Sequence, residues 1–129
     1  MASQFPVVAL MGPRQSGKTT LSKKVFKNYA YVSLEDLDSR STASSDPRNF
    51  LSLFDRFEGV IIDEIQEVPE LLSYMQGIVD LKNRPGFFII TGSQNFLLHE
   101  KITQTLAGRI ALLTLLPLSI CELEKSQML

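Results

Sequence analysis

The chain has 129 residues, which is enough for one domain of ordinary size and too few for two. Hydrophobic residues make up 44% and charged residues 21%, a globular composition that excludes a disordered chain. The net charge of −1 gives no general argument for nucleic-acid binding, and the single cysteine, Cys121, excludes an intrachain disulfide. The N-terminal residues lack a signal-peptide pattern, and no apolar run approaches the ~20 residues of a membrane span, so we expect a cytoplasmic protein.

Short apolar runs alternate with helical patterns along the chain. The runs expected as strands are Val7–Met11, Tyr31–Leu34, Gly59–Asp63, Phe87–Thr91 and Arg109–Leu115. The segments expected as helices are Thr20 to about Asn28, a helix capped by Asp46 with Pro47 at its first position, Pro69–Asn83, and about Asn95–Ala107. The serine-rich segment 39–45 is expected to be a surface loop. This alternation predicts an α/β fold in which helices cover both faces of a five-stranded parallel sheet.

The first expected helix has a mixed pattern. Leu21, Val25 and Tyr29 repeat every four residues and predict the side that faces the sheet. The other side carries Lys23, Lys24 and Lys27. This basic side is either a solvated face or a contact surface for an anionic partner.

A phosphate-binding loop follows the first expected strand. The pattern G-x-x-x-x-G-K-[ST] is filled by Gly12, Pro13, Arg14, Gln15, Ser16, Gly17, Lys18 and Thr19, and Thr20 opens the next helix. Backbone N–H groups of such a loop surround the phosphates of a nucleotide, and the helix directs its positive N-terminus at the same anion. Lys18 can reach the outer phosphates, the Thr19 hydroxyl can bind Mg²⁺, and Arg14 can meet a phosphate or an acidic neighbour. We therefore expect these nine residues to form a nucleotide site.

A second motif, Val60-Ile61-Ile62-Asp63-Glu64, supports this interpretation. Asp63 ends an apolar strand at its carboxyl end, which is the sheet edge where open α/β proteins bind ligands. Its carboxylate can hold Mg²⁺ opposite Thr19, directly or through water. Glu64 can orient and polarise the attacking water as a catalytic base, although it can also be a solvated residue that starts a turn.

Polar residues follow the fourth expected strand in the run Thr91-Gly92-Ser93-Gln94-Asn95. In ATPases with an Asp-Glu second motif, this strand lies between the first and third strands. A polar side chain at its tip then faces the terminal phosphate and the attacking water. We favour Gln94 or Ser93 for this role, and the sequence does not decide between them. A helix-capping role for Ser93 or Asn95 is compatible with it.

Two further residues are Arg109, for which the sequence supports two roles equally, and His99. Arg109 precedes the fifth expected strand, where an arginine of a ring-forming ATPase reaches into the neighbouring subunit's nucleotide site. A surface arginine at a strand entrance is the equally supported alternative. His99 is the single histidine, and no cluster with metal-ligand spacing surrounds it, so we expect a surface residue.

Taken together, these motifs resemble those of the prokaryotic AAA-type ATPases in which an AAA domain precedes a C-terminal domain of unknown function. The residues that carry the resemblance are Gly12–Leu21, Ile62-Asp63-Glu64-Ile65-Gln66 with Pro69–Leu72, Thr91–Gln94, Leu106-Ala107-Gly108-Arg109, Leu116-Pro117-Leu118-Ser119 and, more weakly, Asp46–Leu51. The resemblance implies a P-loop NTPase fold of three α/β/α layers with sheet order 5-1-4-3-2. It also implies Mg²⁺-dependent ATP binding and hydrolysis that moves attached or partner domains.

The resemblance also shapes the expected domain organisation. Residues 1–118 are expected to form the ATPase domain, and residues 119–129 to start a truncated C-terminal region, although a natural short terminal helix is the alternative. Expected partners are ATP, that C-terminal domain, and further copies of the chain if Arg109 acts between subunits. The protein or nucleic acid on which the hydrolysis acts is not identified.

Two other functions are alternatives to the ATPase. A nucleotide-controlled binding switch with very slow turnover would use the same motifs. A GTPase is disfavoured because Asp63-Glu64-Ile65-Gln66 stands where an Asp-x-x-Gly switch would be expected, and no [Asn/Thr]-Lys-x-Asp motif occurs in the sequence.

Overall fold

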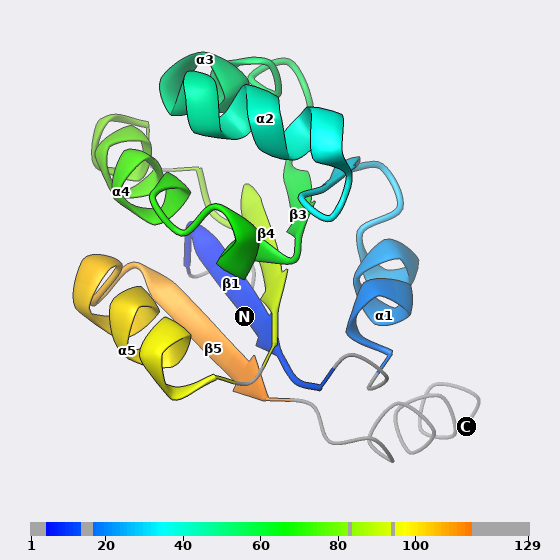
Figure 1. Ribbon diagram of the computed structural model, residues 1–129, viewed down its shortest axis with the longest axis vertical. Coiled ribbons are helices and arrows are strands. Elements are labelled where there is room, and N and C mark those ends of the chain that lie inside the picture. The colour runs from blue at the N-terminus through cyan, green and yellow to red at the C-terminus, as the bar shows by residue number, and fades with distance from the viewer. Residues whose placement is uncertain (1–4, 14–16, 83, 94, 115–129) are drawn as a thin grey trace.

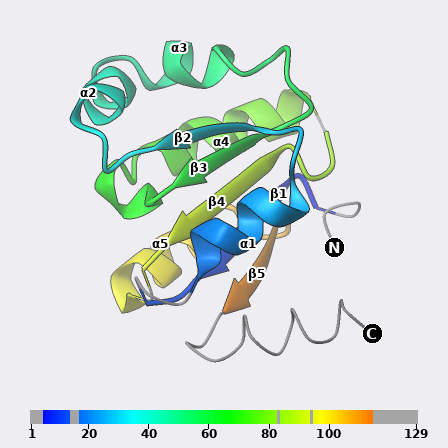
Figure 2. The ribbon, with the colours of Figure 1, turned by 90° about the vertical axis from the view of Figure 1, so that its right-hand side faces the viewer.

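The computed structural model describes residues 5–13, 17–82, 84–93 and 95–114. Its strands are β1 (Val7–Met11), β2 (Ala30–Ser33), β3 (Val60–Asp63), β4 (Phe88–Gly92) and β5 (Ile110–Thr114). All neighbouring pairs are parallel and the order is β2-β3-β4-β1-β5, which is the predicted order 5-1-4-3-2 counted from the opposite edge (Figure 1 and Figure 2). The predicted α/β fold is therefore confirmed.

Helices cover both faces of this sheet. They are α1 (Lys18–Val25), α2 (Leu37–Ser45), α3 (Pro47–Ser52), α4 (Leu71–Leu81) and α5 (Phe96–Thr105), with a short 3₁₀ helix η1 (Ile65–Glu67) after β3. Helix α1 lies on one face, and α4 and α5 lie on the other, with α2 and α3 beyond the β2 edge (Figure 2). The described part of the chain contains no helix long and apolar enough to cross a membrane.

The core is divided between the two faces because successive strand residues point to opposite sides. Val7 and Ala9 of β1 belong to the larger cluster, which includes buried residues of α2, α3, α4 and α5. Val8 belongs to a smaller cluster, against which Phe26 and Tyr29 pack after α1. All residues of β1, β3 and β4 are buried, as the continuous apolar runs predicted.

The prediction of a surface loop at residues 39–45 is wrong, because this segment lies in α2. Its composition is poor in strong helix formers, so intrinsic propensity gives little signal. Asp36 caps the helix, its side chain accepting a hydrogen bond from the Ser39 N–H at 3.0 Å. Arg40 then donates to the Leu34 carbonyl at 2.9 Å, and Ala43 is fully buried in the core. Tertiary contacts therefore outweigh propensity here.

The expected sheet-facing side of α1 is also partly wrong. Val25 is 53% exposed, and α1 ends there, so Tyr29 lies outside the helix. The buried residues of α1 are Lys18 and Ser22, one turn apart. The first helical turn thus places a lysine in the interior, which is unusual for a charged residue and points to a site.

The remaining boundaries agree with the expected ones to within a few residues. Asp46 caps α3, accepting from the Asn49 N–H at 3.2 Å, and Pro47 occupies the first turn, as predicted. The expected helix end at Asn83 lies outside the described residues, and so do the expected start of a C-terminal region at 119–129 and Cys121.

Candidate functional site

Three strands bring polar groups together at the carboxyl edge of the sheet. The ends of β1, β3 and β4 are neighbours, and the Gly12 N–H donates to the Gly92 carbonyl at 3.1 Å where the loop leaves β1. Gly17 begins α1 in a left-handed conformation with φ of 82°, which glycine adopts at little cost. This turn directs the first residues of α1, and the positive end of the helix, toward the tips of the strands.

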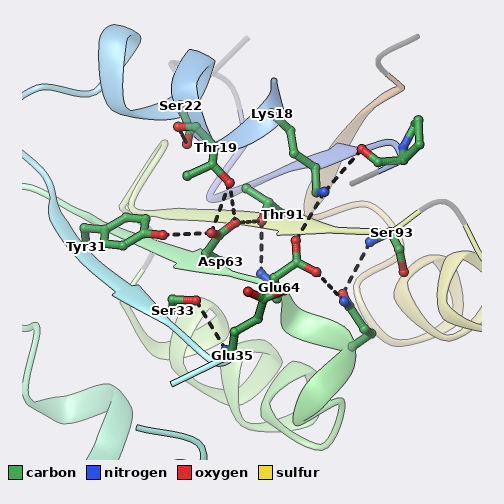
Figure 3. Close-up of polar contacts among 12 residues, drawn as sticks. Lys18, Thr19, Ser22, Tyr31, Ser33, Glu35, Asp63, Glu64, Thr91 and Ser93 are labelled. Carbon is green, nitrogen blue, oxygen red and sulfur yellow. Dashed lines mark hydrogen bonds and ion pairs between the residues drawn. The ribbon is translucent and has the colours of Figure 1, made fainter. Parts of the chain in front are cut away.

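Lys18 forms a buried ion pair with Glu64. Its Nζ lies 3.2 Å from Glu64 Oε1, and the two side chains are only 1% and 6% exposed (Figure 3). The ammonium group also donates to the Pro13 carbonyl at 3.5 Å. Removing two charges from water is costly unless they compensate each other, so this pair fixes a lysine head beside the loop that the sequence assigned to phosphate binding.

Thr19 and Asp63 face each other across the same site. The Thr19 hydroxyl lies 3.0 Å from both carboxylate oxygens of Asp63. Hydroxyl and carboxylate oxygens are the ligand types that Mg²⁺ prefers. No group of three or more histidine, cysteine or acidic side chains suited to a metal occurs among the described residues. The residues therefore fit Mg²⁺ held between protein and phosphate oxygens.

Two hydroxyl groups that the sequence analysis did not select also bind Asp63. Tyr31 on the edge strand β2 donates to Oδ2 at 2.7 Å, and Thr91 of β4 donates to Oδ1 (Figure 3). Burial, followed by the bond to Asp63 and its charge, raises the pKa of Tyr31 well above its ordinary value. The Lys23 ammonium lies 3.9 Å above the Tyr31 ring, so one lysine of the basic helix side contacts an aromatic face.

Glu64 leaves the strand in a left-handed conformation, with φ of 60° and ψ of 57°. Its N–H donates to the Thr91 hydroxyl at 3.0 Å, and Gln66 Nε2 donates to its Oε2. At 5% exposure Glu64 is buried, so the interpretation as a solvated turn residue does not describe it. Gln66 was missed as a site residue, because its role depends on this backbone turn.

The residue that follows β4 contacts the amide of Gln66. The Ser93 N–H donates to Gln66 Oε1 at 3.3 Å, which places Ser93 next to the site. Asn95 instead caps α5, its side chain accepting from the Leu97 and Leu98 N–H groups at 2.8 and 3.1 Å. The capping role predicted as possible for Asn95 is confirmed, and Gln94 lies outside the described residues.

Arg109 lies at the opposite, amino edge of the sheet. Its carbonyl accepts from the Val7 N–H at 3.2 Å, where β1 begins. Its guanidinium binds both carboxylate oxygens of Asp80 on α4, at 2.6 and 3.2 Å. Arg109 therefore does not contribute to the site of its own chain.

The remaining predicted residues are exposed, lie outside the described residues, or belong to the described part of the loop. Thr20 is exposed on α1 and His99 is exposed on α5. Arg14, Gln15 and Ser16 lie outside the described residues. The described part of the loop, with Gly12, Pro13 and Gly17, borders the ion pair and the Thr19–Asp63 contact.

Comparison with known proteins agrees with this geometry. A family model described as an AAA domain matches residues 4–124. The chain belongs to this AAA family. Membership confirms the AAA-type P-loop ATPase family that the motifs resemble, and with it a nucleotide-binding domain of P-loop type.

Relatives and solved structures extend the comparison. Uncharacterized proteins of Mycobacterium tuberculosis and Mycobacterium bovis are each 37% identical over 123 residues, covering 94% of this AAA domain chain. The chain spans only 27% of the length of each of these relatives. A solved structure of a DNA replication initiation factor matches with a TM-score of 0.50 at 14% identity, covering 99% of this chain and 46% of that one. At such identity the likeness supports the fold alone.

Proposed function

We propose that this AAA domain binds Mg²⁺–ATP and hydrolyses it. The observation that carries the proposal is the convergence of four side chains at the carboxyl edge of the sheet, namely the buried Lys18, Asp63 and Glu64 and the half-buried Thr19. These are the residue types required to hold a phosphate chain, to bind a divalent cation and to activate water.

Lys18 is the proposed ligand of the outer phosphates. It is already positioned at the N-terminus of α1, with its charge compensated by Glu64 at 3.2 Å. A phosphate group entering the loop offers a second anionic partner, so Lys18 can move from one to the other without becoming an uncompensated buried charge. Backbone N–H groups at the helix start add to the attraction for the phosphates.

Thr19 and Asp63 are the proposed residues that would hold Mg²⁺. When bound, the ion would neutralise charge on the phosphate oxygens and orient the phosphate chain. Tyr31 and Thr91 hold the Asp63 carboxylate through their hydroxyl groups, so its orientation is fixed before any cation arrives.

Glu64 is the proposed general base. Water attacks the terminal phosphorus atom of ATP, and the bond between this atom and the bridging oxygen of the leaving ADP breaks. The water proton passes to the Glu64 carboxylate. The role requires that a carboxylate oxygen be available to water. Departure of Lys18 toward the phosphates frees Oε1, so phosphate binding itself prepares the base.

A nucleotide-controlled switch is the second candidate, and one observation favours it. Both carboxylate oxygens of Glu64 are engaged, Oε1 by Lys18 and Oε2 by Gln66, which would keep turnover slow if Lys18 did not leave. Either function would move attached or partner domains, and the relatives are long enough to contain such domains.

Action of Arg109 on a neighbouring copy belongs to the same proposal, because ring-forming ATPases use an arginine in this way.

The test is calorimetric titration with Mg²⁺–ATP and Mg²⁺–GTP, followed by phosphate release under the same conditions. We expect saturable binding of ATP and its loss in Lys18→Ala. That variant leaves Glu64 without its cation, so its melting temperature must be measured alongside to separate lost binding from lost folding. Binding without phosphate release would support the switch, and failure of a well-folded wild-type chain to bind either nucleotide would contradict both functions.

A further inference from the structure

Gln66 connects the candidate base to the tip of β4 with both ends of its amide. Its Nε2 donates to Glu64 Oε2, and its Oε1 accepts from the Ser93 N–H at 3.3 Å. A backbone N–H can only donate, so the amide oxygen must face Ser93 and the amide nitrogen must face the carboxylate. The chemistry of the two partners thus fixes the orientation of this side chain.

The backbone is shaped to bring this amide back to Glu64. Among the residues that the structure describes, Glu64 is the one non-glycine residue with positive φ, at 60°. Such a conformation costs energy for a side chain of this kind and is maintained where the surroundings require it. The 3₁₀ helix Ile65–Glu67 follows directly, so residue 66 returns alongside residue 64.

The space for the amide depends on Gly92 at the end of β4. A Cβ atom at this position would lie 3.2 Å from Gln66 Oε1 and 3.0 Å from a methyl group of Leu98. These distances are tighter than ordinary contacts, so a side chain at 92 would press on the amide. Gln66 is therefore packed against Gly92 of β4 and hydrogen-bonded to Ser93, the residue that follows this strand.

The two oxygens of Glu64 have partners of different kinds. Oε1 faces Lys18, which a phosphate would attract away, whereas Oε2 faces Gln66, a neutral side chain anchored on β4. We propose that Gln66 is a positioning residue that retains Oε2 when Lys18 leaves, so that Oε1 is the oxygen that receives the proton of the attacking water. This inference rests on the proposed hydrolysis and adds to it the residue that aims the base.

Two substitutions of Gln66 test the role of its amide. Gln66→Met removes both hydrogen bonds and keeps a side chain of similar length. Gln66→Glu keeps an acceptor for the Ser93 N–H but sets a carboxylate against that of Glu64. A matched control is Gln104→Ala, which removes the amide of an exposed glutamine whose Nε2 lies 3.4 Å from Glu100 Oε1 on α5.

Steady-state turnover, ATP affinity and melting temperature should be measured for each variant. We expect kcat to fall between about ten- and a hundred-fold in Gln66→Met, and at least as far in Gln66→Glu, since misplacement of a reacting group is costly. The Kd for Mg²⁺–ATP should stay within about two-fold of the wild type, because the amide of Gln66 contacts Glu64 and the Ser93 N–H and neither Lys18 nor Thr19. Gln104→Ala should match the wild type in all three measurements.

A double-variant cycle separates positioning from general structural damage. If Gln66 acts through Glu64, adding Gln66→Met to Glu64→Gln should reduce single-turnover hydrolysis no further. An equal loss in both backgrounds would overturn the proposal, as would wild-type kcat in Gln66→Met or Gln66→Glu. A wild-type chain that binds ATP without turnover would overturn the proposed hydrolysis, and this role with it, whereas an active wild type with an active Gln66→Met would overturn this role alone.

Discussion

An ion pair lies at each edge of the sheet, and the two pairs have opposite surroundings. At the carboxyl edge, Lys18 and Glu64 are 3.2 Å apart and their side chains are 1% and 6% exposed. At the amino edge, Arg109 and Asp80 approach to 2.6 Å, with side chains 33% and 49% exposed. The shorter pair is therefore the more exposed one.

The comparison shows that the distance between two charged groups does not by itself indicate how much the pair contributes to stability or function. Exposed pairs contribute little to stability on average because water screens the charges, and the bidentate geometry of Arg109 is the arrangement in which such a pair contributes most. The pKa of Arg109 is raised, first by the hydrogen bond to Asp80, but the group remains at the surface. The buried pair costs desolvation of both ions, and hydrophobic residues of the same volume would often be as stable. The proposed exchange of partners on phosphate binding would explain its presence.

The largest expected effect follows from neutralising the buried carboxylate. Glu64→Gln keeps the shape of the side chain and removes the proposed base, so we expect turnover to fall about 10²- to 10⁴-fold. ATP affinity should be kept or increased, because Lys18 no longer has a competing anion. Phosphate release and calorimetric titration measure the two quantities, and a parallel loss of affinity and turnover would contradict the partner exchange.

Breaking the buried pair from the lysine side should lower stability. Lys18→Met leaves Glu64 buried without a cation, and we expect the free energy of unfolding to fall by about 3–5 kcal/mol. The double variant Lys18→Met with Glu64→Leu should recover much of this loss, since neither charge then remains buried. Urea unfolding measures these values, and additive losses in the double variant would show that the two side chains are not coupled.

The location of this pair could be predicted from the sequence for physical reasons. Lys18 and Thr19 belong to a local motif whose backbone shape is set by glycine spacing, and Asp63 ends an apolar strand. The carboxyl ends of parallel strands meet at one edge, so both motifs had to converge once the fold was α/β. The strand order followed from the family resemblance and not from the spacing.

Other contacts of the site could not be predicted in this way. Gln66 reaches Glu64 because a non-glycine residue adopts positive φ, which no sequence pattern here signals. Tyr31 reaches Asp63 across the pairing of β2 with β3, so its role depends on register. Helix α2 was missed for a related reason, since contacts such as the ion pair of Arg40 with Glu67, at 3.3 Å, form only in the folded tertiary structure.

A smaller effect is expected from Tyr31→Phe, which removes one donor to Asp63. We expect the free energy of unfolding to fall by about 1 kcal/mol at neutral pH, because other hydroxyl groups still bind that carboxylate. The folded pKa of Tyr31 is raised above the value near 10 of a free phenol, so the folded state keeps its proton longer. The stabilisation is therefore present below about pH 10 and is lost as the pH rises through the folded pKa.

Urea unfolding of both proteins from pH 8 to pH 11 checks this sign. The wild type should lose stability with rising pH more steeply than Tyr31→Phe, and the gap between them should narrow. A gap that stays constant or widens above pH 10 would contradict the assigned direction.

The smallest effect on stability is expected at the amino edge. Arg109→Ala and Asp80→Ala should each lower the melting temperature only slightly, and the double variant should reveal a weak coupling, since the pair is largely exposed to water. Turnover gives the independent readout. If Arg109 acts on a neighbouring copy, Arg109→Ala should remove any rise in rate per protomer with protein concentration, while Asp80→Ala should preserve it because the arginine remains. Equal turnover in both variants at every concentration would leave Arg109 as a surface partner of Asp80, and a large loss of stability in either would end the contrast between the two edges.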